Sequence, residues 1–92
     1  METRVAILSF IVENPNSVEP LNQLLHEFRE FIIGRMGLPY KEKNISIICV
    51  AMDAPQDMIS SLSGKVGRLE GVSAKAVYSK QQNPIFPFPM VI

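Results

Sequence analysis

The sequence predicts an α+β domain with the element order strand, helix, strand, strand, helix, strand. Two observations lead to this fold class. The runs 4–12 and 45–52 are apolar on both alternating faces, and the segment after each of them repeats apolar residues at helical spacing. The chain has 92 residues, of which 47% are hydrophobic, so it suits one domain with a single core.

The first strand is expected over Arg4–Val12. Polar residues bound this run, which is rich in β-branched residues and too short for a typical helix. One face carries Val5, Ile7 and Ile11 with Ser9, and the other carries Ala6, Leu8, Phe10 and Val12. Two apolar faces are typical of a central strand that is covered on both sides.

The first helix is predicted to begin after Asn16 or Ser17, either of which can cap it. Pro20 is compatible with a helix because it falls within the first turn, where its missing N–H is not needed. Apolar residues then recur at steps of three and four, at Val18, Leu21, Leu25, Phe28 and Ile32. This stripe predicts one amphipathic helix that ends near Gly34.

The middle of the chain predicts a hairpin. A strand is expected over 34–40, and Pro39 places it at a sheet edge or a bulge because proline cannot donate to a ladder. Residues 41–44 are polar and form the expected turn. The run 45–52 is the most apolar in the chain and predicts the second central strand.

The second helix is predicted to have Pro55 at its first position and to end before a turn at 69–71. Val72–Tyr78 is the last strand, and the charge of Lys75 suits an edge. Right-handed crossovers around both helices then give the antiparallel sheet order 4-1-3-2, a ferredoxin-like βαββαβ arrangement with both helices on one face. The other face would expose apolar residues, so we expect a second subunit or the C-terminal segment to cover it.

Two parts of the chain are distinguished by composition. Residues 1–80 form the predicted domain, and residues 81–92 form a proline-rich apolar C-terminal arm. Pro84, Pro87 and Pro89 exclude a helix there and favour an extended conformation.

The charge balance excludes several classes of partner. Nine Lys and Arg residues match nine Asp and Glu residues, so the formal net charge is zero. A nucleic-acid binder or a polybasic membrane-surface protein needs a basic surface, and neither partner is expected. The apolar run 5–12 is too short to span a bilayer and no cleavage site follows it, so we expect a cytoplasmic protein.

The reactive side chains give no catalytic constellation. Cys49 is the only cysteine, which excludes an internal disulfide, and it is expected to be a small buried hydrophobe. His26 lies off the core face of its helix, so a Cys–His pair is not expected. Glu27 and Glu30 are expected to be solvated. We therefore expect no enzyme activity, no metal site and no cofactor.

Two stretches carry a family resemblance: residues 18–40, which end in GRMGLPY, and residues 59–75, which contain LSGKVGRLEGV. With the rest of residues 5–80 they resemble the small ACT-like proteins known as iron-only hydrogenase system regulators. GRMGLPY is the more discriminating motif, because the glycine pattern of the second stretch recurs across many ACT-like domains.

The resemblance implies an ACT-like domain that forms a homo-oligomer, a dimer or a tetramer, with a regulatory role. The family name supplies no ligand, so the expected partner besides a second copy of the chain is a protein of the hydrogenase system or an unknown small molecule. A regulatory or ligand-sensing domain is the leading interpretation. The alternative is an oligomeric scaffold that binds a protein partner without a small ligand.

The resemblance also implies a ligand site, because small ligands of ACT-like domains sit near the first strand-to-helix loop and the start of the second strand. The matching positions are Asn14, Gly34, Arg35, Met36, Gly37 and Leu38. The glycines would let a ligand approach the backbone, and Arg35 would meet a carboxylate. For any one of these residues a structural role is the favoured interpretation: a helix end at Gly34, a bulge at Gly37 and a solvated charge at Arg35. The first loop lacks the glycine of amino-acid-binding ACT domains, which argues against an amino-acid ligand.

Overall fold

The computed structural model describes residues 2–80, so the predicted arm at 81–92 lies outside the described residues. In chain order the elements are β1 (Arg4–Val12), η1 (Pro15–Ser17), α1 (Val18–Glu27), η2 (Arg29–Phe31), β2 (Ile32–Tyr40), η3 (Lys41–Lys43), β3 (Ile45–Ala54), α2 (Gln56–Gly67) and β4 (Val72–Tyr78). The η elements are single turns of 3-10 helix.

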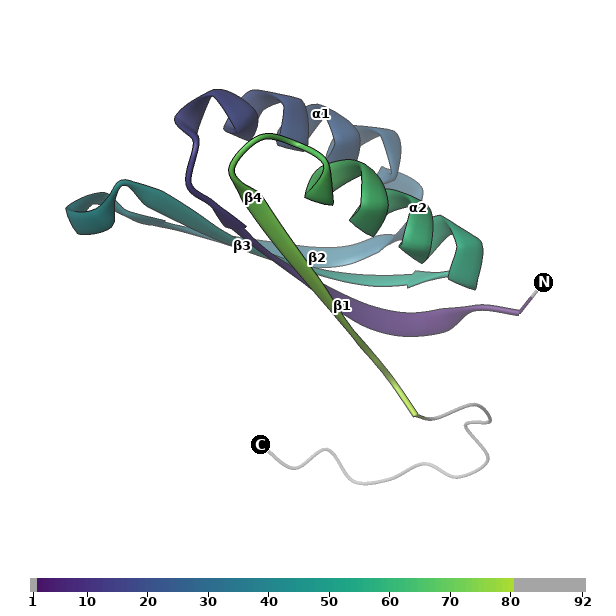
Figure 1. Ribbon diagram of the computed structural model, residues 1–92. Helices are drawn as coiled ribbons and strands as arrows, with labels where there is room; N and C mark the ends of the chain where they lie inside the picture. Colours follow the sequence, from purple (N-terminus) through teal and green to yellow (C-terminus); the bar gives the residue numbers. More distant parts are fainter. Residues whose placement is uncertain (1, 81–92) are drawn as a thin grey trace, which may run out of the picture.

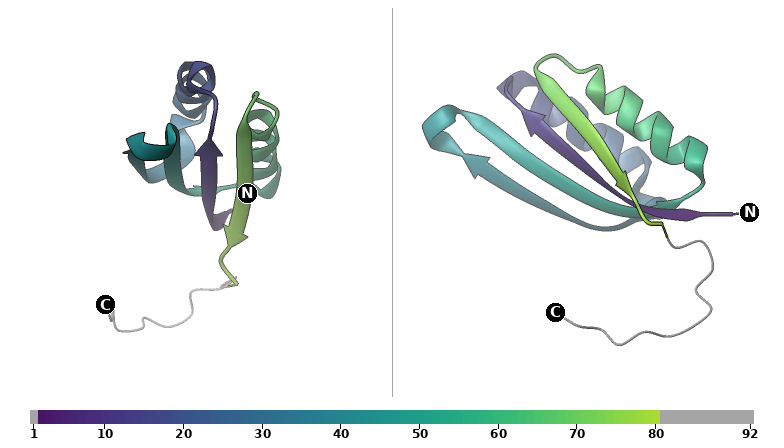
Figure 2. Two further views of the ribbon diagram at one scale, coloured as in Figure 1. Left: turned by 60° about the vertical axis from the view of Figure 1, so that its left-hand side comes forward. Right: turned by 60° about the horizontal axis from the view of Figure 1, so that its bottom comes forward.

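The four strands form one antiparallel sheet in the order β2-β3-β1-β4, and both helices cover the same face (Figure 1). This confirms the predicted βαββαβ order, the two central strands, and the edge positions of Pro39 and Lys75. The end of the β2–β3 hairpin extends beyond the helix layer (Figures 1 and 2).

The core lies between the sheet and the helices. Leu8 and Phe10 of β1 and Val50 and Met52 of β3 have no exposed surface. The helices contribute the fully buried side chains Leu21, Leu25, Ile59, Leu62 and Val66. The predicted division of β1 is confirmed, because alternate residues of a strand point to opposite faces.

The first helix is shorter than predicted, and its end near Gly34 is wrong. Phe28 has φ −101° and ψ 14°, which ends α1 at Glu27. The η2 turn follows, and the chain is already in β2 at Ile32. Phe28 and Phe31 still pack on the core, so the apolar spacing continued after the helical geometry had ended. The β-branched pair Ile32 and Ile33 favours a strand here.

Two smaller boundaries also differ. Pro55 has φ −56° and ψ 148°, so it caps α2 from outside the helix and is not its first residue. The strand β3 extends beyond residue 52 to Ala54, which is fully buried and pairs with Arg4. Burial of this residue explains why the strand continues past the polar Asp53.

Hydrogen bonds join the segment that leads into α1 to the turn before β4. The Ser17 hydroxyl donates a 2.6 Å hydrogen bond to the Glu70 carbonyl, and the Glu13 amide donates to the Gly71 carbonyl at 2.7 Å. Gly71 has φ +71°, and a Cβ there would lie 2.8 Å from the Cβ of Asn14. The close approach and the positive φ both require glycine at this turn.

Candidate functional site

The sheet leaves one face without helices, and this face exposes many large apolar side chains beside the polar residues Ser9, Asp53, Ser73 and Lys75. The right-hand view of Figure 2 has the sheet in front of the helices. The large exposed side chains on this face are Val5, Ile7, Ile11, Met36, Leu38, Tyr40 and Val77. We call this surface the open sheet face. Met36 on one edge strand is 59% exposed and Val77 on the other is 65% exposed, so large apolar side chains are exposed from one edge of the sheet to the other.

A shallow hollow of about 310 Å³ lies on the open sheet face, lined by Ile7, Gly34, Arg35, Met36, Cys49 and Ala51. Cys49 is therefore half-buried on the open face, and the expectation of a core cysteine is wrong. Its sulfur lies 3.8 Å from the Ser9 hydroxyl. The sequence did not show which face of the sheet Cys49 occupies, because both faces of the run 45–52 are apolar.

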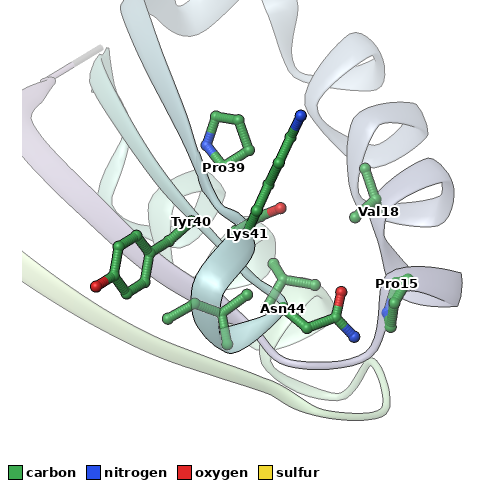
Figure 3. A pocket seen from close by; sticks show the side chains of 9 residues that line it. Pro15, Val18, Pro39, Tyr40, Lys41 and Asn44 are labelled. Atoms are coloured by element: carbon green, nitrogen blue, oxygen red, sulfur yellow. The ribbon is translucent and has the colours of Figure 1, made fainter.

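A second depression runs along the helix side of the edge strand β2. It consists of three adjoining hollows of about 130, 240 and 310 Å³, which share Val18, Pro39 and Ser46 at one junction and Asn22 and Arg35 at the other. We call it the α1–β2 groove. Figure 3 shows its hairpin end, where Lys41 extends between Pro39 and Val18.

The far end of the α1–β2 groove is cationic. Its 310 Å³ hollow is lined by Asn22, Leu25, His26, Arg29, Ile32 and Arg35. Arg35 Nη2 donates to Asn22 Oδ1 at 2.8 Å, and Arg29 Nη1 donates to the His26 carbonyl at 2.9 Å. Both guanidinium groups are thus held by neutral acceptors on the same helix.

The strand β2 presents the predicted site residues to two different surfaces. By its register with β3, Gly34, Met36 and Leu38 lie on the open sheet face, whereas Arg35 and Gly37 lie on the side of α1. Five of the six predicted residues therefore lie on one strand. The resemblance did not distinguish its two faces.

Asn14 lies apart from the other five predicted residues. Its side-chain amide donates to Glu70 Oε1 at 2.6 Å, and its Oδ1 accepts from the Asn16 amide at 2.9 Å. These bonds direct Asn14 toward the turn before β4. Its neighbour Pro15 lines the hairpin end of the α1–β2 groove.

Three polar residues that line the far hollow of the groove were not predicted as a site: Asn22, His26 and Arg29. Asn22 and His26 are four residues apart and lie on one side of α1, and Arg29 follows three residues later in the η2 turn, so their spacing was a usable signal. The sequence did not show that this side faces Arg35, because the helix was expected to continue to Gly34.

The described residues contain no group of three or more His, Cys, Asp or Glu side chains that could hold a metal ion. No helix between residues 2 and 80 is long and apolar enough to cross a membrane. The aromatic residue of β1, Phe10, is fully buried beneath the helices, so it offers no stacking surface for a base.

The sheet order, the helix layer and the apolar open face define a small ferredoxin-like α+β domain. Residues 4–76 match the family model described as "TM1266-like: Iron-only hydrogenase system regulator, putative". The chain belongs to this family. The structure of the protein TM1266 from Thermotoga maritima is similar, with 39% sequence identity and a TM-score of 0.82, over 86% of this chain and 100% of that one.

Two more distant structures share the fold alone. The C-terminal domain of the MgtC protein from Mycobacterium tuberculosis has 10% identity and a TM-score of 0.64, over 89% of this chain and 94% of that domain. A formyltetrahydrofolate deformylase from Pseudomonas putida has 15% identity and a TM-score of 0.59, over 79% of this chain but 28% of the enzyme. No curated protein matches the chain.

Proposed function

We propose that this chain is a non-catalytic, cytoplasmic regulatory domain of the iron-only hydrogenase system that senses a small ligand and acts as a homo-oligomer. Membership of the regulator family supports the system-level role. The ligand site is the segment Gly34–Leu38 together with the α1–β2 groove beside it. Asn14 contributes indirectly, by holding the loop that leads into α1.

One observation carries the proposal: β2 takes part in both surfaces. Met36 and Leu38 face the open sheet face, while Arg35 and Gly37 face the groove. A ligand in the groove therefore contacts the same strand that supplies part of the apolar face. Movement of this strand is a direct route from ligand binding to assembly, since coupling requires an element that both sites influence.

The open sheet face is the proposed contact between copies of the chain. Its apolar side chains are more exposed than a stable monomer favours, and no charged residue separates Ile7, Met36 and Leu38. A dimer or a tetramer would remove this surface from water. Burial of apolar surface is the dominant favourable term in most protein association.

A thermal-shift screen against small metabolites and metal ions tests ligand sensing, because a ligand that binds only the folded chain raises Tm. Gly37→Leu is the informative variant, since a Cβ at Gly37 meets no atom within 4 Å and the larger side chain would fill the groove. Gln23→Leu, at an exposed position of α1 outside the groove, is the matched control. We expect the ligand-dependent rise in Tm to vanish in Gly37→Leu and to persist in Gln23→Leu.

The alternative is a scaffold that binds a protein of the hydrogenase system and no small molecule. It is favoured by the size of the individual hollows described, about 130 to 310 Å³, which lie below or only just within the usual range for a ligand site. Sites for small molecules commonly measure about 300 to 1,000 Å³. No rise in Tm with any ligand, combined with recovery of a hydrogenase-system protein on the immobilised chain, would favour the scaffold.

A further inference from the structure

We infer that the hollow between Arg29, Arg35 and His26 binds a small organic anion, whose carboxylate or phosphate group is held by the two guanidinium groups. The inference rests on the proposed function, because it names the chemical class of the ligand and the residues that hold it. It adds the C-terminal end of α1 to a site that the resemblance had confined to β2 and the first loop.

The first argument is the distribution of charge. The chain has equal numbers of acidic and basic residues, yet no carboxylate lines any of the three hollows of the α1–β2 groove. Arg29 and Arg35 form no ion pair with any Asp or Glu among residues 2–80, and each has one neutral hydrogen-bond acceptor. Two such arginines around one hollow give a local positive potential in a neutral protein.

The second argument is that the two guanidinium groups are held in place. A guanidinium carries its N–H donors in a rigid planar fork, which matches the oxygens of a carboxylate or a phosphate. Asn22 Oδ1 accepts one N–H of Arg35, and the His26 carbonyl accepts one N–H of Arg29. The remaining N–H groups are available to an anion, and the anchored side chains lose less conformational entropy when it binds.

The third argument is the composition of the wall. Leu25 and Ile32 line the same hollow as the two arginines, so one part of the site is apolar. Leu25 is 1% exposed and lies behind the wall, so Ile32, which is half-buried and packs on the core, supplies the apolar surface that a ligand can reach. A ligand with an anionic group and a compact apolar portion satisfies both parts, whereas inorganic phosphate alone satisfies only the first.

The acidic residues of the neighbouring elements do not occupy the site. Glu27 and Glu30 are exposed residues that flank it in sequence, but neither lines the hollow. The carbonyls at the end of α1 carry partial negative charge, and the bond from Arg29 to the His26 carbonyl offsets one of them. Two more of these carbonyls accept hydrogen bonds from the Phe28 amide, so the anion meets fewer competing acceptors.

NMR titration of the ¹⁵N-labelled full chain tests the inference, with inorganic phosphate, phenyl phosphate and benzoate as probes and benzamide as the neutral counterpart of benzoate. We expect saturable shifts at Asn22, His26 and Arg35, stronger binding of phenyl phosphate than of phosphate, and no response to benzamide. Arg29→Gln and Arg35→Gln should each weaken binding by about tenfold or more, because a charged hydrogen bond is lost.

Arg68→Gln is the matched control, since it removes the same charge from an exposed residue at the end of α2, outside the groove. Equal weakening in Arg68→Gln and Arg35→Gln would overturn the inference, as would shifts that map elsewhere or no shifts at millimolar probe. Binding of either organic anion at the hollow supports the inference. Tighter binding of phenyl phosphate would identify the ligand as a phosphate ester, and tighter binding of benzoate would identify it as a carboxylate.

The outcome also separates this inference from the proposed function. If a neutral or cationic compound raises Tm in the thermal-shift screen while the three anions leave the hollow unshifted, ligand sensing stands and the anion site is wrong. If the anions bind at the hollow and the chain remains monomeric, the anion site stands and the proposed assembly is wrong.

Discussion

Asn22 on α1 accepts a 2.8 Å hydrogen bond from the guanidinium of Arg35 on β2, thirteen residues later in the chain. The bond crosses the α1–β2 groove and joins the helix to the edge strand. It holds one of the two cations of the inferred anion site. Both partners are exposed, so the contact contributes more to the orientation of Arg35 than to the stability of the fold.

Asn22→Ala tests whether this hydrogen bond orients Arg35 without contributing to the stability of the fold. The substitution removes the acceptor from Arg35 but leaves both guanidinium groups in the chain. We expect the affinity for phenyl phosphate to fall about threefold to tenfold, while the free energy of unfolding changes by less than about 1 kcal/mol. NMR titration and urea unfolding measure the two quantities, with Gln23→Ala as the control on the same helix. A loss of affinity as large in Gln23→Ala would argue against a positioning role for Asn22.

Gly71→Ala tests the junction between the first loop and β4. The added Cβ would lie 2.8 Å from the Cβ of Asn14, and the backbone has φ +71°. We expect the free energy of unfolding to fall by about 1 to 3 kcal/mol, because alanine is strained in this conformation and the loop must shift. Gly37→Ala is the comparison, since a Cβ there has open space, and it should leave stability nearly unchanged. Urea unfolding that gives similar losses for both variants would contradict the strained turn.

Leu8→Ala and Ile7→Ala compare the two faces of β1 at adjacent positions. Leu8 is fully buried beneath the helices, whereas Ile7 is 47% exposed on the open sheet face. We expect Leu8→Ala to lower the free energy of unfolding by about 2 to 5 kcal/mol, as large-to-small core substitutions do. Ile7→Ala should cost less than about 1 kcal/mol when it is measured in a Met36→Lys background, which we expect to keep the chain monomeric. Equal losses would mean that the open sheet face is covered within one chain.

Much of the fold could be predicted from the residues because its patterns are local. The two apolar faces of Arg4–Val12 identified a central strand, and Pro39 and Lys75 marked the two edges. The end of α1 could not be found in this way, because Phe28 and Phe31 follow the last helical residue, Glu27, yet still pack on the core and continue the apolar spacing of the helix.

The site was predictable only in part, because it depends on contacts between distant segments. The resemblance indicated Gly34–Leu38, but the division of these residues between two faces follows from the register of β2 with β3. The bond from Asn14 to Glu70 joins residues that are 56 positions apart, and nothing local predicts it. The groove could be predicted only if the end of α1 was known, because Arg35 faces Asn22 only when the helix ends at Glu27.

Sedimentation velocity at micromolar concentration tests the central claim, that the open sheet face joins copies of this chain. We expect the wild-type chain to sediment as a dimer or a tetramer, and Met36→Lys to sediment as a folded monomer, because a charge at this 59% exposed position disrupts an interface without entering the core. Gln23→Lys, with the same added charge at an exposed position of α1, should remain associated. A wild-type chain that sediments as a monomer, or a Met36→Lys variant that associates as the wild type does, would contradict the account.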